Sequence, residues 1–261
     1  MKSQIRKELK THWMGKDIYY FTETDSTNMQ AKNLSSACHG ALIVADKQTA
    51  GRGRLGRTWS SPAGSSIYMT LRLEPKIIPD KAPMLTLVMA LSVAETVHEV
   101  TGLEASIKWP NDIVVNKKKI CGILTEMSVD TTGIQYVVIG VGVNVNTKDF
   151  PEEIQDMATS LYKEAGMTFD RAKIIAKILK RFEANYETFM QNGSLASLAG
   201  SYNARLINKN KEVRVLEPGQ EYNGYALGIN EVGELLVRRA DGSVENIFAG
   251  EVSVRGLFGY V

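Results

Sequence analysis

The residues best suited to chemistry lie in one short stretch in which glycine and arginine alternate, Gln48-Thr49-Ala50-Gly51-Arg52-Gly53-Arg54-Leu55-Gly56-Arg57-Thr58-Trp59. It directly follows an apolar run at residues 41–45, which predicts a buried strand. Glycine lets a backbone approach a ligand closely, and arginine offers a planar fork of donors that matches carboxylates and phosphates. The stretch therefore predicts an anion-binding loop at a strand end.

Other interpretations of this loop compete with that one. Gly51-x-Gly53-x-x-Gly56 matches the dinucleotide-binding fingerprint, but that motif needs a helix to start within it, and turn-forming residues follow at 58–64. A solvated basic loop is the plain alternative. A nucleic-acid-binding loop would carry several aromatic residues in a basic domain. This one has only Trp59, and the chain carries 31 Lys+Arg against 29 Asp+Glu, too balanced for a general polyanion binder.

A second polar cluster, Lys108-Trp109-Pro110-Asn111-Asp112, lies in a predicted hairpin. Apolar runs at residues 106–115 and 120–126 flank a short polar turn. Because Pro110 cannot donate to a strand ladder, the chain should bend there and turn Lys108, Trp109, Asn111 and Asp112 toward one place. Of the lysines at 117–119, the first two are expected in a solvated turn, whereas Lys119 belongs to the returning strand opposite Asp112.

Two further groups of polar residues stand at the ends of predicted elements. Residues 24–28 are good helix caps before a helix expected at 29–37. Ser26, Thr27 and Asn28 nevertheless present more donors and acceptors than one cap needs, so a polar ligand there stays open. An apolar strand at 135–145 should place Asn144 and Asn146 at the open mouth of the sheet.

The remaining pattern indicates two domains. Residues 66–73 alternate as a strand, 79–100 form a core helix, and Asp170 caps a long amphipathic helix that stops at Asn192-Gly193. From about Lys209, short strands separated by turns at Pro218-Gly219, 231–233 and Asp241-Gly242 predict a small antiparallel barrel. The division predicted is 1–208 and 209–261.

Composition excludes several classes of protein. Of the 261 residues, 44% are hydrophobic and 23% charged, and no uninterrupted apolar window has the ~18 residues of a membrane span. The first ten residues lack the apolar region of a signal peptide. Two cysteines and three histidines without ligand-like spacing argue against a zinc site and for a reducing, cytoplasmic setting.

Taken together, these motifs resemble those of the biotin protein ligases over nearly the whole chain. The matching motifs, in order, are Gly-Arg-Gly-Arg-x-Gly-Arg-x-Trp, Lys-Trp-Pro-Asn-Asp, Lys-x-x-Gly-Ile-Leu, a Gly-x-Gly-x-Asn strand end and a small C-terminal barrel. The resemblance implies an α/β (α+β) catalytic domain, a mixed sheet flanked by helices and related to class II aminoacyl-tRNA synthetases and lipoate ligases. It also implies an appended SH3-like barrel.

The resemblance further implies a reaction. Biotin and ATP, with Mg²⁺, give biotinyl-5′-adenylate and pyrophosphate, and the adenylate then acylates one lysine of a biotin carboxyl carrier protein domain of a biotin-dependent carboxylase. Such chemistry depends on positioning and on cations that offset anionic charge.

By the same resemblance, Ser26, Thr27, Asn28 and Gln48 lie at the biotin end, and Lys119 with the backbone of Gly51, Arg52, Gly53 and Arg54 holds its carboxylate. Trp59 lies against adenine, and Arg57, Lys108, Asn111 and Asn144 lie on the ATP side, with the metal ligands left open. Lys119, Arg54 and Asp112 are the catalytic candidates, and Asp112 either orients a lysine or accepts the proton of the incoming amine.

One departure from the family is informative. Many members carry an N-terminal DNA-binding domain, whereas the residues before Ile18 are too few for one. The sequence thus resembles the enzyme-only class without specific DNA binding, unless it is part of a longer chain. A lipoate ligase would not be expected to show the arginine loop, and a pure biotin- or DNA-binding regulator would not need the ATP-side residues. The oligomeric state is left open, a homodimer included.

Overall fold

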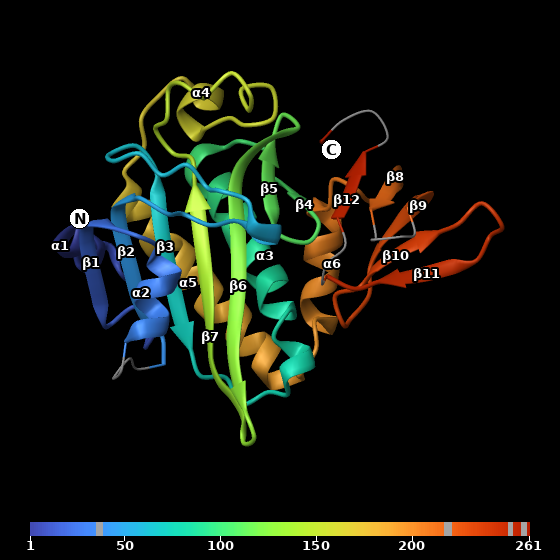
Figure 1. Cartoon of the computed structure of the whole chain (residues 1–261), viewed down its shortest axis with the longest axis horizontal. Coiled ribbons are helices and arrows are strands. Elements are labelled where there is room, and N and C mark those ends of the chain that lie inside the picture. Colours follow the sequence, from blue (N-terminus) through green and yellow to red (C-terminus); the bar gives the residue numbers. More distant parts are fainter. Residues whose placement is uncertain (35–38, 217–220, 250–252, 257–259) are drawn as a thin grey trace.

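The computed structural model describes residues 1–34, 39–216, 221–249, 253–256 and 260–261. Its larger part is a seven-stranded sheet whose order is β1-β2-β3-β7-β6-β5-β4 (Figure 1). In that order the strands are Ile18–Thr24, Ala41–Gln48, Ile67–Leu73, Gly133–Val143, Lys118–Asp130, Asp112–Val115 and Ser106–Lys108. β1 and β2 pair in parallel and the other neighbours pair antiparallel. The predicted mixed sheet is confirmed.

Helices cover both faces of this sheet. Figure 1 shows α3 (Met84–Thr101) and α5 (Arg171–Asn192) behind it, and α2 (Thr27–Asn33) in front. Leu42 and Val44 of β2 join the large core, whereas Ile43 between them packs with Ala31 of α2. This is the alternation expected of a strand with both faces buried. The shorter helices are α1 (Lys2–Glu8), α4 (Leu161–Ala165) and α6 (Ala196–Arg205), with 3-10 turns η1 (Arg54–Gly56) and η2 (Pro79–Lys81).

The predicted helix boundaries are largely confirmed. The carboxylate of Asp170 accepts hydrogen bonds from the backbone of Ala172 and Lys173, and Gly193 ends α5 with φ 64°. Residues 79–101 are long and apolar enough to cross a membrane by length and composition alone, but 72% of the most apolar 18-residue window within them is buried inside the protein. The helix expected at 29–37 instead begins at Thr27 and ends at Asn33, and residues 35–38 lie outside the described part.

The second unit is a five-stranded antiparallel, SH3-like sheet in the order β11-β10-β9-β8-β12. Its strands in chain order, β8 to β12, are Lys211–Leu216, Tyr222–Ile229, Leu235–Arg238, Val244–Ile247 and Ser253–Gly256. Gly233 and Gly242 occupy their predicted turns at φ 83° and 87°, while Pro218-Gly219 lies outside the described residues.

Trp109 joins the two units, and as expected it also borders the same cavity as Lys108, Asn111 and Asp112. Its ring is buried, its indole N–H donates to the carbonyl of Gly233, and its backbone N–H donates to Asn208. The indole therefore anchors the small sheet.

Candidate active site

The glycine–arginine loop (residues 51–59) leaves the end of β2 and folds as a small hairpin of its own. Gly53 N–H donates to Arg57 O at 2.7 Å, and Trp59 N–H donates to Gly51 O at 2.9 Å. At the tip, Leu55 and Gly56 have φ of 56° and 71°. A Cβ on Gly51 would lie 2.5 Å from the carbonyl oxygen of Trp59, so glycine at this position allows the two sides of the hairpin to pair.

Two cavities meet beside this loop. The larger is a cleft of about 910 Å³ between the loop, the 149–158 segment and the small sheet, the size of a ligand site. The smaller measures about 50 Å³ and lies over β6 and β7. Residues that border both cavities mark the junction: Gly53, Arg54, Trp59, Tyr68, Asn111 and Lys119.

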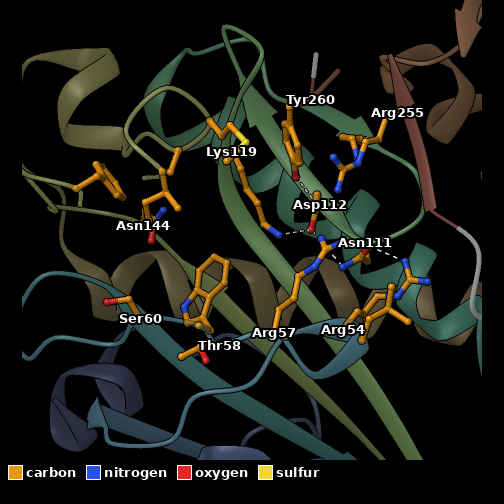
Figure 2. A pocket seen from close by; sticks show the side chains of 18 of the residues that line it. Arg54, Arg57, Thr58, Ser60, Asn111, Asp112, Lys119, Asn144, Arg255 and Tyr260 are labelled. Carbon is orange, nitrogen blue, oxygen red and sulfur yellow. Dashed lines mark hydrogen bonds and ion pairs between the residues drawn. The ribbon is translucent and has the colours of Figure 1, made fainter. Parts of the chain in front are cut away.

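Asp112 is the centre of the polar cluster in the large cleft. Its Oδ1 atom lies 2.6 Å from Lys119 Nζ and accepts a hydrogen bond from Asn111 at 3.2 Å. Arg54 in turn donates to Asn111 Oδ1 at 3.0 Å. Figure 2 shows Lys119, Arg57 and Tyr260 directed toward Asp112, with Asn144 on another side of the cleft. The predicted catalytic candidates are thus together.

The register of the hairpin differs in detail from the prediction. Gly122 is the residue across from Asp112, while Lys119 pairs with Val114. A register shift beside Ile113 displaces the ladder, and the long lysine side chain makes up the offset. The 157–159 segment also fixes the backbone of Lys119, whose N–H donates to Met157 O and whose carbonyl accepts from Thr159.

Lys108 places a second cation deep in the cleft. Its side chain is buried, and burial lowers the pKa of its ammonium to about 8, although Asp112 acts in the opposite direction. The cations of Lys119, Arg255 and Arg54 lower that pKa further. Burial also lowers the pKa of Arg54. A buried lysine and a partly buried arginine in a cleft with few acids indicate an anionic ligand.

The small cavity is lined by the other predicted polar residues. Gln48 Oε1 accepts from the backbone N–H of Thr27 at 2.8 Å and from its hydroxyl at 3.1 Å. Asn28 bonds Thr70 and Glu126. Ser26 stands at the N-cap position of α2, yet its hydroxyl makes no capping bond. The helix-cap position expected for Ser26 is therefore confirmed, but its hydroxyl does no capping, and the residue also borders the cavity.

Trp59 closes the small cavity from above. A Cβ on Gly142 would lie 2.6 Å from its ring, and one on Gly122 would lie 3.0 Å from it. Lys119 Nζ lies 5.3 Å from the ring centroid, and the buried Trp59 Nε1 finds no hydrogen-bond partner among the described residues. Glycines on two neighbouring strands therefore make a flat floor on which a ring can lie.

Asn144 lies apart from the Asp112 cluster, with its amide donating to Thr159 O at 3.1 Å. Arg52 borders only the small cavity, and Arg57 borders only the large one. Tyr260 is a cleft residue that sequence analysis missed, because it stands beyond the last strand and belongs to no periodic pattern.

Comparison with known proteins agrees with this geometry. The model of the "Biotin/lipoate A/B protein ligase family" matches residues 19–144, and that of the "Biotin protein ligase C terminal domain" matches residues 210–255. The bifunctional ligase/repressor BirA of Bacillus subtilis is 42% identical over 259 residues, 97% of this chain and 78% of its own length. The chain belongs to the biotin protein ligase family.

Other biotin protein ligases are similar over most of this chain. The biotin–acetyl-CoA-carboxylase ligase of Mycobacterium tuberculosis is 32% identical, over 92% of this chain and 89% of its own. The Aquifex aeolicus biotin protein ligase, solved in complex with biotin and ATP, superimposes with a TM-score of 0.84 at 36% identity, covering 92% of this chain and 99% of that one. This biotin protein ligase is therefore a ligase enzyme with the family fold.

Proposed function

We propose that this biotin protein ligase converts biotin and ATP into biotinyl-5′-adenylate and pyrophosphate, and then transfers biotin to a lysine of a biotin carboxyl carrier protein domain. The observation that carries the proposal is the junction of the two cavities. Lys119 and Arg54 stand where a small polar cavity meets a large cationic cleft. A carboxylate arriving from one side would meet a phosphate arriving from the other.

In the first step a biotin carboxylate oxygen bonds to the α-phosphorus of ATP, and the bond to pyrophosphate breaks. Both reactants are anionic, so fixed cations must offset their repulsion. We assign this to Lys119 and Arg54 at the junction, with Arg57 and Lys108 on the ATP side. In the second step the carrier amine attacks the acyl carbonyl and AMP leaves.

Asp112 is proposed to orient Lys119 rather than to accept the proton of the amine. Its Oδ1 is already engaged by Lys119 and Asn111, and its Oδ2 accepts from Tyr260. A carboxylate with both oxygens occupied is poorly placed to take a proton from an incoming group. The ion pair instead fixes the ammonium at the junction.

Biotin binding requires Trp59 to move. We propose that the ureido end of biotin lies among Ser26, Thr27, Asn28 and Gln48, with its carboxylate at Lys119 and the backbone of Gly51, Arg52, Gly53 and Arg54. The cavity there, about 50 Å³, is far below the roughly 300 Å³ of ordinary ligand pockets. Moving the indole off the glycine floor would enlarge it and leave Trp59 available to adenine, with Asn111 and Asn144 on the nucleotide side.

Mg²⁺ is proposed to bind together with ATP, through the phosphates, rather than at a preformed site of protein ligands. No group of three or more His, Cys, Asp or Glu side chains gathers in the described parts of the chain. Mg²⁺ is commonly held by substrate phosphates with only one or two carboxylates. When bound, it would offset phosphate charge, and Asp149 at the cleft is the candidate to approach it.

The setting proposed is the cytoplasm, where ATP and reduced thiols are available. Cys121 is a free, fully buried thiol whose pKa burial raises, so it is kept unreactive. We further propose the division at 1–208 and 209–261, with no specific binding of DNA. The partner is the carrier domain, and a homodimer remains an arrangement to be tested by sedimentation.

A carrier assay tests the proposed function. A purified biotin carboxyl carrier domain is incubated with this enzyme, biotin and MgATP, and its mass is measured. We expect one biotinyl group on one lysine, none without ATP, and none when that lysine is replaced by arginine. An unmodified wild-type carrier alongside a folded enzyme would refute the transfer step.

A further inference from the structure

Tyr260 reaches the centre of the catalytic cleft from the far end of the sequence. Its hydroxyl donates a hydrogen bond to Asp112 Oδ2, and Lys108 Nζ lies 4.4 Å from the centroid of its ring. Figure 2 shows it beside Lys119, on the same carboxylate. One side chain from beyond the last strand thus touches an anion and a cation, both of them buried.

The contact between Val261 and β12 places the end of the chain at the small sheet. β12 pairs with β8 at the edge of the small sheet. Gly256 ends β12, and the backbone of Val261 packs so closely on it that any Cβ there would collide with Val261. Glycine at 256 therefore leaves room for Val261 against β12, and Tyr260 beside it lines the cleft.

The contacts of Asp112 show what Tyr260 controls. Lys119 and Asn111 share Oδ1, whereas Oδ2 has its hydrogen bond from Tyr260. Without that bond the carboxylate could rotate toward neighbouring cations, and the Lys119 ammonium would lose its fixed position. Burial, together with the charge of Asp112, raises the pKa of Tyr260, so its hydroxyl keeps its proton and remains a donor.

We propose that Tyr260 is a positioning residue for adenylation: its hydroxyl fixes the Asp112 carboxylate, which holds the Lys119 ammonium at the junction of the two cavities. A residue that follows the last strand of the small sheet thereby completes the active site of the larger domain. This inference rests on the proposed function, because it assigns Tyr260 a part in the same reaction. The tyrosine ring against Lys108 also helps to keep a cation in the cleft.

Tyr260→Phe tests the hydroxyl and leaves the ring in place. A hydrogen bond to a charged group is worth about tenfold or more in rate, so kcat for biotin-dependent ATP–pyrophosphate exchange should fall about tenfold, with KM for biotin changed less than about twofold. Tyr222→Phe is the matched control, because Tyr222 also donates to a carboxylate, Glu245, on the small sheet. It should change neither constant, and thermal melting should show both variants folded.

A double variant separates positioning from a structural role. If Tyr260 acts through Asp112 and Lys119, adding Tyr260→Phe to Lys119→Ala should cost less than about twofold further, since the group being positioned is gone. A full tenfold loss in that background, no loss in the single variant, or a faster reaction would each overturn the inference. A wild-type enzyme without biotin-dependent exchange would instead refute the proposed function.

Discussion

Replacing Lys119 with alanine should slow adenylation strongly and leave the fold intact. The ammonium lies 2.6 Å from the Asp112 carboxylate, and the lysine side chain is 26% exposed. At an effective dielectric constant near 20, a unit charge roughly 4 Å from developing charge is worth about 4 kcal/mol, and partial exposure reduces this. We therefore expect a loss of about 10²–10³ in the adenylation rate, as for other preorganised donors.

Lys118→Ala is the control for this prediction. Lys118 is adjacent on β6, but successive strand residues face opposite sides, and its ammonium donates to Gln155 O at 3.2 Å. Its loss should change the rate less than about twofold. The assay is ATP–pyrophosphate exchange driven by biotin, with thermal melting to confirm folding.

The Lys119→Ala variant also leaves Asp112 as a buried carboxylate without its ion pair, beside anionic substrates. Asp112→Asn in the same background should therefore recover part of the lost rate, with a coupling of about 0.5–3 kcal/mol between the two sites. Small and equal effects of the alanine replacements at 118 and 119 would refute the reasoning and support a solvated turn for all three lysines.

Three other predictions concern charge and the loop. Because burial lowers the pKa of Lys108 to about 8, its positive charge is lost as pH rises, so kcat/KM for ATP should fall above about pH 8. Lys108→Arg should move this fall in kcat/KM to higher pH. A fall at the same pH in the variant would contradict the assignment of Lys108 to ATP binding. Biotin with ATP should order the glycine–arginine loop and suppress trypsin cleavage at Arg52, Arg54 and Arg57. Mapping the first cleavage sites with and without ligand tests this. A first cut elsewhere, or a cut in the loop that ligand does not suppress, would mean that the loop is preformed. With 31 Lys+Arg against 29 Asp+Glu, this sequence should bind duplex DNA only weakly and non-specifically, and a salt-resistant gel shift would overturn that expectation.

The polar cluster around Asp112 could be predicted because its members are local in sequence or end neighbouring elements, while the catalytic roles proposed for them came from the family resemblance. A hairpin with a proline bend brings Asp112 near Lys119, and an anion-binding loop after a buried strand brings Arg54 to Asn111. Single strands of the large sheet, the capped helix α5 and the small antiparallel unit follow from periodicity and turn residues, whereas the mixed sheet itself was implied by the family resemblance.

The features of the site that could not be predicted from the sequence depend on tertiary contacts between distant segments. The direction of Trp109 is decided by a carbonyl in the small sheet, at Gly233. The offset between Lys119 and Asp112 arises from a register shift that no residue type in this stretch predicts. Tyr260 enters the cleft from another unit, so no local pattern could have placed it beside Asp112.

The most direct measurement for the central claim is ATP–pyrophosphate exchange with biotin and with lipoate as alternative acids. The proposed function predicts exchange that requires the enzyme and biotin, does not occur with lipoate, and collapses in Lys119→Ala. No exchange with biotin, or equal exchange with lipoate, would contradict the assignment of the two cavities to biotin and ATP.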